Sequence, residues 1–105
     1  METKKIMLVC AAGMSTSLMV NKMQKAAEER GLAATIIAVP VSEAEDYLSE
    51  KKVDVLLLGP QVRYLLEDLQ GKLASKGIPV DVIPMTDYGM MKGDKVLDLA
   101  ESLMK

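Results

Sequence analysis

The sequence contains no histidine, and this absence limits the chemistry that the chain can perform alone. Ser-His-Asp and Cys-His catalysis within the chain are excluded, because both use an imidazole as the base. No phosphohistidine can form here either, so any histidine chemistry has to come from a partner protein. The chain has one cysteine, Cys10, which excludes an internal disulfide and a zinc site built from several thiolates.

Aromatic residues are also scarce: there is no Phe and no Trp, and only three Tyr occur in 105 residues. Aliphatic side chains and nine methionines must therefore fill the interior, and methionine adapts well to irregular gaps. Half of the residues are apolar, which is enough for a real core. The length predicts one domain that spans residues 1–105.

Long apolar runs and basic clusters are missing too. No run approaches the roughly 18 residues of a membrane span, and the N-terminal segment shows no signal-peptide pattern. We therefore expect a soluble, cytoplasmic protein without direct membrane insertion. The net charge is -2 and the Lys and Arg residues are scattered, which argues against binding to nucleic acid.

Four short apolar runs alternate with four amphipathic stretches. The runs cover Ile6–Val9, Thr35–Val39, Val53–Leu58 and Val80–Ile83. They are rich in Val, Ile and Leu, as is typical of strands that are covered on both faces. The alternation predicts an α/β fold with a single four-stranded parallel sheet, right-handed crossovers and helices on both faces, of the flavodoxin-like or Rossmann-like type.

Local signals predict where the helices begin and end. The first is expected to begin within 15–17 and to stop at Gly31. Ser42 and Glu45 form a capping-box pattern that predicts the start of the second. The fourth is expected to begin near Asp94. The third has apolar residues at helical spacing: Val62, Leu65, Leu66 and Leu69.

In an open parallel sheet, ligands bind beyond the carboxyl ends of the strands. Three predicted loops meet this condition, at Cys10–Thr16, Gly59–Gln61 and Pro84–Lys92. The first places a cysteine at the end of a buried strand, followed by small residues and by hydroxyl residues that open a helix. Successive backbone amides and a helix N-terminus form a cradle for an anion and favour the thiolate, which is the nucleophilic form of cysteine.

Two interpretations of this loop follow. A nucleophile inside a phosphate cradle indicates phosphoryl transfer through a covalent cysteinyl phosphate. The structural alternative is a buried cysteine that packs as a small hydrophobe ahead of an ordinary helix cap. The alignment of small and hydroxyl residues with both the strand end and the helix start favours the functional interpretation.

The segment V-C-A-A-G-M-S-T-S-L resembles the active-site loop of IIB subunits in the lactose/cellobiose/chitobiose branch of the bacterial phosphoenolpyruvate-dependent sugar phosphotransferase system. The exit of the third strand, L-L-L-G-P-Q, resembles the second loop of the same family. The resemblance implies a phosphocarrier and phosphotransferase subunit. Its thiol would take a phosphoryl group from a phosphohistidine of a IIA protein and deliver it to a sugar held by a membrane IIC permease. We expect a β-linked disaccharide of the cellobiose or chitobiose type, and lactose stays open, because the sequence does not name the sugar.

By residue match, Cys10 would be the phosphorylated nucleophile. The resemblance implies no cofactor and no metal, and a monomer is expected, because no helix presents a second apolar stripe. Gln61 and Tyr88 are candidates for the rim of the site, because their predicted loops lie at the same edge of the sheet. The predicted phosphate-binding residues are Ala11, Ala12, Gly13, Met14, Ser15 and Thr16.

Low-molecular-weight tyrosine phosphatases are similar in fold and in this loop, but their pattern is C-x5-R. The sixth residue after Cys10 is Thr16, so the bidentate arginine clamp is missing. This departure argues against a phosphatase or an arsenate-reductase-like enzyme. Hydrolysis of an aryl phosphate by the protein would support that hypothesis again. A regulatory domain of a transcriptional system is the other alternative.

Three further residues have ordinary structural explanations. Tyr64 is expected to pack against the rest of the chain. Asp87 could act as a general acid, but a turn aspartate is the commoner case. Met90 lies in a predicted loop near the site and would suit either a local plug or a surface that meets partners.

Overall fold

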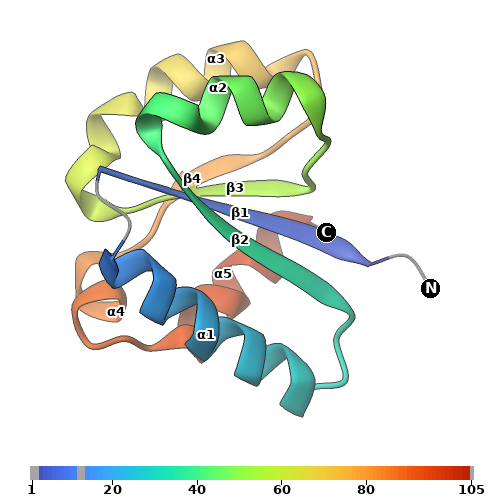
Figure 1. Ribbon diagram of the computed structural model, residues 1–105, viewed down its shortest axis with the longest axis vertical. Coiled ribbons are helices and arrows are strands. Elements are labelled where there is room, and N and C mark those ends of the chain that lie inside the picture. Colours follow the sequence, from blue (N-terminus) through green and yellow to red (C-terminus); the bar gives the residue numbers. More distant parts are fainter. Residues whose placement is uncertain (1–2, 12–13, 105) are drawn as a thin grey trace.

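The computed structural model describes the backbone of residues 3–11 and 14–104, and the side chains of these residues except 14–16. Strands and helices alternate along the chain (Figure 1). The strands are β1 (Lys4–Cys10), β2 (Ala34–Pro40), β3 (Val55–Leu58) and β4 (Val80–Val82). The helical segments are α1 (Met14–Glu29), α2 (Val41–Glu50), the 3-10 segment η1 (Pro60–Leu65), α3 (Leu66–Ala74), α4 (Met85–Gly89) and α5 (Gly93–Met104).

The four strands form one parallel sheet in the order β2-β1-β3-β4, which confirms the predicted architecture. In this register Cys10 lies opposite Pro40 of β2, and Val9 lies opposite Leu58 of β3. Leu58 in turn lies opposite Val82 of β4. The carboxyl ends of all four strands therefore meet at one edge, where ligands bind in open parallel sheets.

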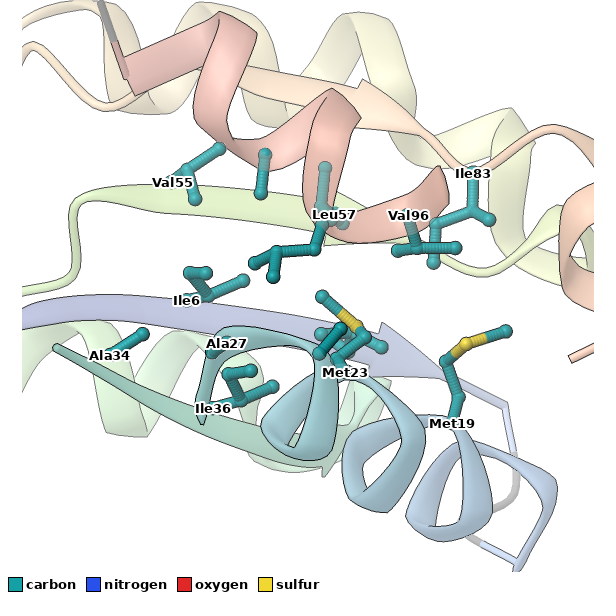
Figure 2. Packing of buried hydrophobic residues seen from close by; sticks show 14 of the residues in the cluster. Ile6, Met19, Met23, Ala27, Ala34, Ile36, Val55, Leu57, Ile83 and Val96 are labelled. Atoms are coloured by element: carbon teal, nitrogen blue, oxygen red, sulfur yellow. The ribbon is translucent and has the colours of Figure 1, made fainter. Parts of the chain in front are cut away.

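Helices cover both faces of the sheet, with α2 and α3 on one side and α1, α4 and α5 on the other (Figure 1). Successive residues of β1 point alternately to the two layers. Ile6 and Leu8 join the apolar cluster beneath α1 and α5, where Figure 2 shows Met19 and Met23 directed at the sheet. The opposite cluster includes Val9 and lies beneath α2 and α3. Because both layers bury β1, the position of its last residue is tightly fixed.

The contact between α1 and α5 is unusually close at Gly93. A β-carbon at this position would lie 2.6 Å from the carbonyl carbon of Lys22 and 2.7 Å from the amide nitrogen of Met23. Only glycine therefore lets α5 begin against α1 at this distance. The packing fixes α1, whose N-terminus follows the candidate nucleophile.

At the other end of α1, Arg30 is bonded to α5. Its guanidinium lies 2.7 Å from Asp98 Oδ1 and 2.7 Å from Glu101 Oε1, and it donates to the carbonyl oxygen of Asp94 at 2.9 Å. The hydrogen bond to Glu101, with support from Asp98 and against partial desolvation, raises the pKa of Arg30 above its ordinary value. Arg30 thus clamps two helices together.

Two predicted details are wrong in this structure. The segment Pro84–Lys92 is not all loop, because α4 occupies its first part. The capping box of Ser42 and Glu45 does not form: α2 already begins at Val41, and its N-cap is Pro40, without a side-chain cap. The fixed φ of proline sets the start of this helix instead.

The third predicted helix also differs. It begins as η1 and continues as α3, with a kink at Val62, whose φ of -118° and ψ of 23° are not helical. Tyr64 was expected to pack, but its side chain is 74% exposed. Val62, Leu65 and Leu66 define the apolar side of this segment, and Tyr64 lies opposite that side even in a regular α-helix, so the expectation that it packs was wrong on the helical period alone. Within the described parts of the chain, no helix is long and apolar enough to cross a bilayer.

Candidate active site

Cys10 is the last residue of β1, and α1 begins at Met14. The cysteine is free and buried, with 2% of its surface exposed, whereas the following Ala11 is exposed. Ala12 and Gly13, two of the predicted phosphate-binding residues, lie outside the described residues. So do the side chains of Met14, Ser15 and Thr16, whose part in phosphate binding stays a prediction.

The sequence favours an abrupt change from strand to helix after Cys10, because residues 11–13 are small. Helix α1 extends over 16 residues and has no acidic residue in its first turn. The first amides of a helix lack partners within the helix, and the helix dipole adds positive potential there. An anion near the end of β1 would therefore meet backbone donors without competition from a carboxylate of that first turn.

A second loop follows β3 and is bonded to the end of β1. The amide of Gly59 donates to the carbonyl oxygen of Val9 at 2.9 Å. Pro60 then opens η1, where its missing amide hydrogen costs no hydrogen bond. A β-carbon on Gly59 would lie 3.1 Å from Oε1 of Gln61, so the Gln61 side chain folds back over this glycine.

Tyr88, on α4, reaches the same glycine from the other layer. Its ring carbon Cε2 lies 3.8 Å from the position of a β-carbon on Gly59, and the residue is buried. The two candidate rim residues, Gln61 and Tyr88, are thus brought together beside the residue that is bonded to Val9. Their contact with a phosphoryl group stays a prediction.

Gln61 and Tyr88 also line a groove of about 580 Å³. Its other walls come from η1 and α4, and they are Pro60, Arg63, Tyr64, Met85 and Gly89. Sequence reasoning did not assign Arg63 or Met85 to the site. A signal was present, because both follow the carboxyl end of a predicted strand within a few residues.

Neither arginine supplies the clamp of a C-x5-R loop. Arg30 is held at the far end of α1 by Asp98 and Glu101, and Arg63 lies in η1. Within residues 3–11 and 14–104, no group of three His, Cys, Asp or Glu side chains is arranged to hold a metal ion. The described residues offer a thiol at the end of β1, and the N-terminus of α1 follows four residues later in the chain.

Two solved structures share this fold. The lactose-specific IIB domain of the phosphoenolpyruvate:carbohydrate phosphotransferase system from Streptococcus pneumoniae aligns with a TM-score of 0.87 over 99% of this chain and 100% of that one. At 16% identity, this likeness concerns the fold alone. The cellobiose-specific IIB component from Borrelia burgdorferi aligns with a TM-score of 0.78 at 39% identity, over 98% and 93% of the two chains. The fold is therefore that of a phosphotransferase-system IIB component.

The family described as "PTS system, Lactose/Cellobiose specific IIB subunit" matches residues 5–99, and this chain belongs to it. IIB components of this system are phosphotransferases that take part in sugar phosphotransfer. The galactose-specific EIIB component of Lactococcus lactis subsp. cremoris is 52% identical over 99% of both chains. The cellobiose-specific component of Lactococcus lactis subsp. lactis is 51% identical over 99% of both. The oligo-beta-mannoside-specific component of Bacillus subtilis is 44% identical over 96% of both.

Proposed function

We propose that Cys10 accepts a phosphoryl group from a phosphohistidine on a IIA protein and passes it to a β-linked disaccharide bound by a membrane IIC permease. The observation that carries this proposal is the place of the chain's one cysteine. It ends the strand β1, at the edge of the sheet where α1 begins. Membership of the family supports the general role in phosphoryl transfer, and the position of Cys10 supports its assignment as the nucleophile.

In the first step, the Cys10 thiolate attacks the phosphorus of the phosphohistidine in line. The sulfur–phosphorus bond forms as the nitrogen–phosphorus bond breaks, and the imidazole nitrogen keeps the electron pair of that bond. The equatorial oxygens carry the negative charge, which the amides at the start of α1 would stabilise. The chain needs no histidine of its own, because the donor supplies it.

In the second step, a sugar hydroxyl attacks the phosphorus of the cysteinyl phosphate. The oxygen–phosphorus bond forms, the sulfur–phosphorus bond breaks, and Cys10 leaves as the thiolate. In this proposal a base on the permease takes the hydroxyl proton. Phosphoryl transfer of this kind depends mainly on positioning and on electrostatic stabilisation.

The burial of Cys10 fits a carrier that must keep its phosphoryl group until a partner arrives. A thiol with 2% exposure is shielded from water as well as from partners. Docking of the donor therefore has to open a path to the sulfur. The absence of an arginine clamp in the Cys10 loop also favours storage of the phosphoryl group over its rapid hydrolysis.

The sugar that we propose is a cellobiose- or chitobiose-type disaccharide, by analogy with the cellobiose-specific relatives from Lactococcus lactis and Borrelia burgdorferi. The galactose-specific relative is equally similar to this chain, so overall identity does not select the sugar. Uptake assays with each sugar in cells that lack the protein test this part separately.

The test of the relay is the intact-protein mass after incubation with phosphoenolpyruvate, the general phosphotransferase proteins and a cognate IIA protein. We expect one added phosphoryl group on the wild type and none on Cys10→Ser, since a serine hydroxyl is far less ionised than a thiol. Addition to the Cys10→Ser variant would contradict the assignment. An unmodified wild type beside a charged IIA, together with hydrolysis of an aryl phosphate, would instead indicate a phosphatase.

A further inference from the structure

Four large apolar side chains face solvent, and each lies on or next to a helical segment that follows the carboxyl end of a strand. They are Leu18, Tyr64, Met85 and Met90, each between 49% and 74% exposed. Leu18 lies on α1 after β1, Tyr64 on η1 after β3, and the two methionines on or next to α4 after β4. All three segments follow the carboxyl end of a strand, at the side of Figure 1 where η1 and α4 lie. Tyr64 and Met85 line the same groove, and adjacent exposed apolar groups of this kind mark interaction surfaces.

The groove between η1 and α4 lies within this region, and Tyr64 and Met85 form two of its walls. It is continuous with the candidate active site, because Gln61 and Tyr88 line the groove and also adjoin Gly59. Gly59 is bonded to the residue directly before Cys10. A protein that occupied the groove would therefore stand next to the end of β1.

Arg63, on the same wall, gives the groove its charge. In the part of the chain that the structure describes, no carboxylate forms an ion pair with Arg63, in contrast to Arg30 with its two. Tyrosine, methionine and arginine are the residues in which protein interfaces are enriched, and tyrosine and arginine often dominate the binding energy. The groove thus offers the aromatic ring of Tyr64 beside the guanidinium of Arg63, which has no ion pair among the described residues.

The charge of Arg63 distinguishes between the two proteins that must reach Cys10. Cytoplasmic loops of membrane proteins carry an excess of Lys and Arg, so a permease would meet repulsion at Arg63. A soluble donor is not subject to this excess of Lys and Arg, and its surface can present a carboxylate to Arg63.

We propose that the groove between η1 and α4 is the docking surface for the IIA phosphoryl donor. An apolar side chain of the donor would lie between Tyr64 and Met85, and a donor carboxylate would pair with Arg63. The inference rests on the proposed function, because it names the partner of that site. The docking proposal concerns only residues outside the loop that follows Cys10, whereas the proposed function concerns Cys10 itself.

The test compares Tyr64→Ala and Arg63→Glu with two matched controls. Tyr64→Phe keeps the ring, and Lys52→Glu reverses an exposed charge just before β3, at the opposite edge of the sheet. Because Tyr64 and Arg63 are exposed, their variants should fold, and thermal unfolding checks this. Two rates are measured over a range of protein concentration: phosphorylation by charged IIA, and transfer from the phosphorylated chain to sugar in membranes that contain the permease.

We expect Tyr64→Ala and Arg63→Glu to raise the KM of the IIA step by about tenfold or more, with a plateau rate within about twofold of the wild type. Both controls, and the permease step, should stay near the wild-type values. An unchanged KM in both variants would overturn the proposal. So would a defect confined to the permease step, or the loss of a wild-type dimer in Tyr64→Ala, which would assign the groove to a second copy.

A wild type that receives no phosphoryl group from charged IIA would contradict the proposed function rather than this surface. The calorimetric Kd for uncharged IIA then decides the docking question with the same four variants. Weaker binding by Tyr64→Ala and Arg63→Glu alone supports the groove. Equal binding by all four, or no binding by the wild type, overturns it.

Discussion

The amide of Gly59 donates a 2.9 Å hydrogen bond to the carbonyl oxygen of Val9, the residue directly before Cys10. This bond continues the pairing of β1 and β3 by one step beyond the end of β3. It ties the loop that carries Gln61 to the backbone of the candidate nucleophile. A displacement of the second loop is therefore expected to reach Cys10 through one hydrogen bond.

The first prediction concerns the space at Gly59. A β-carbon there would lie 3.5 Å from the Val9 carbonyl oxygen and 3.1 Å from Gln61 Oε1, so alanine fits if the flexible Gln61 side chain shifts. The two branches of valine would crowd the Val9 carbonyl group and the Tyr88 ring. We expect Gly59→Val to lower stability by about 1–3 kcal/mol and to slow phosphorylation of Cys10. Gly59→Ala should remain near the wild type.

Thermal unfolding and the mass-based phosphorylation assay measure these two effects. The backbone of Gly59 has φ -62° and ψ 152°, which any residue adopts, so backbone strain plays no part in the difference. Equal phosphorylation rates in Gly59→Val and Gly59→Ala would mean that the second loop does not influence the position of Cys10.

The second prediction contrasts two glycines in helices. Gly93→Ala would place a β-carbon 2.6 Å from the backbone of Lys22, so α5 would have to move away from α1. Gly71, in α3, has open space around its own β-carbon position. We expect Gly93→Ala to destabilise the protein by about 1–3 kcal/mol. Gly71→Ala should stabilise it by about 0.5–1 kcal/mol, because alanine loses less backbone entropy in a helix.

Urea unfolding of the two variants checks the contrast, because each change adds the same methyl group to a helix. A Gly93→Ala variant as stable as the wild type would mean that the α1–α5 contact is loose. The predicted loss is expected to lower the phosphorylation rate as well, since the proposed mechanism depends on the amides at the start of α1.

The central strands β1 and β3 were predictable because each is an apolar run that both layers of helices bury, whereas the edge strands β2 and β4 are only partly buried. Val55–Leu58 is a good example: all four residues are buried, and all four belong to a continuous aliphatic stretch. Cys10 at the strand end was predictable for the same reason, since the run stops where the small residues begin. Helix α4 could not be predicted in this way, because five residues are too few to establish a helical period.

The groove was harder to foresee, because it depends on how η1 turns. Helical spacing of Val62, Leu65 and Leu66 predicted a regular α-helix, whereas the segment begins as a 3-10 helix with a kink at Val62. The same spacing turns Tyr64 away from the apolar side of such a helix, so its exposure agrees with the helical period and not with the expectation that it packs. Local geometry of this kind is set by tertiary packing, and no single residue type in the segment signals it.

The third prediction uses the clamp formed by Arg30. Arg30→Leu removes the contacts to Asp98, Glu101 and the Asp94 carbonyl group, while it keeps an apolar stem. The Arg30 side chain is 33% exposed, so solvent screens these interactions. We expect a loss of only about 1 kcal/mol at low ionic strength. The loss should shrink in about 1 M salt, where the Debye length is about 3 Å.

The pH dependence of this clamp follows from the pKa of Arg30, which is raised in the folded protein. A raised pKa gives stability that is complete below the unfolded-state value and is lost only as the pH rises through the folded-state value. The unfolded-state and folded-state pKa values of Arg30 both lie far above neutral pH, so the difference in stability between Arg30→Leu and the wild type should be flat from about pH 7 to pH 10. A marked change within that window would mean that a different group titrates there.

The last prediction concerns access to Cys10. The thiol is 2% exposed, so a reagent such as iodoacetamide can reach it in the native protein only when the surrounding structure opens. We expect labelling to be slower than in the urea-unfolded chain by about tenfold or more, because opening reactions cost free energy. With one cysteine in the chain, the added mass reports this site alone.

Gly71→Ala serves as a control with unchanged surroundings of Cys10, and it should label at the wild-type rate. Phosphorylated protein should not be labelled, because the sulfur is then bonded to phosphorus. Equal labelling of native and unfolded protein would show that the thiol is open in solution, and docking would not be needed to uncover it.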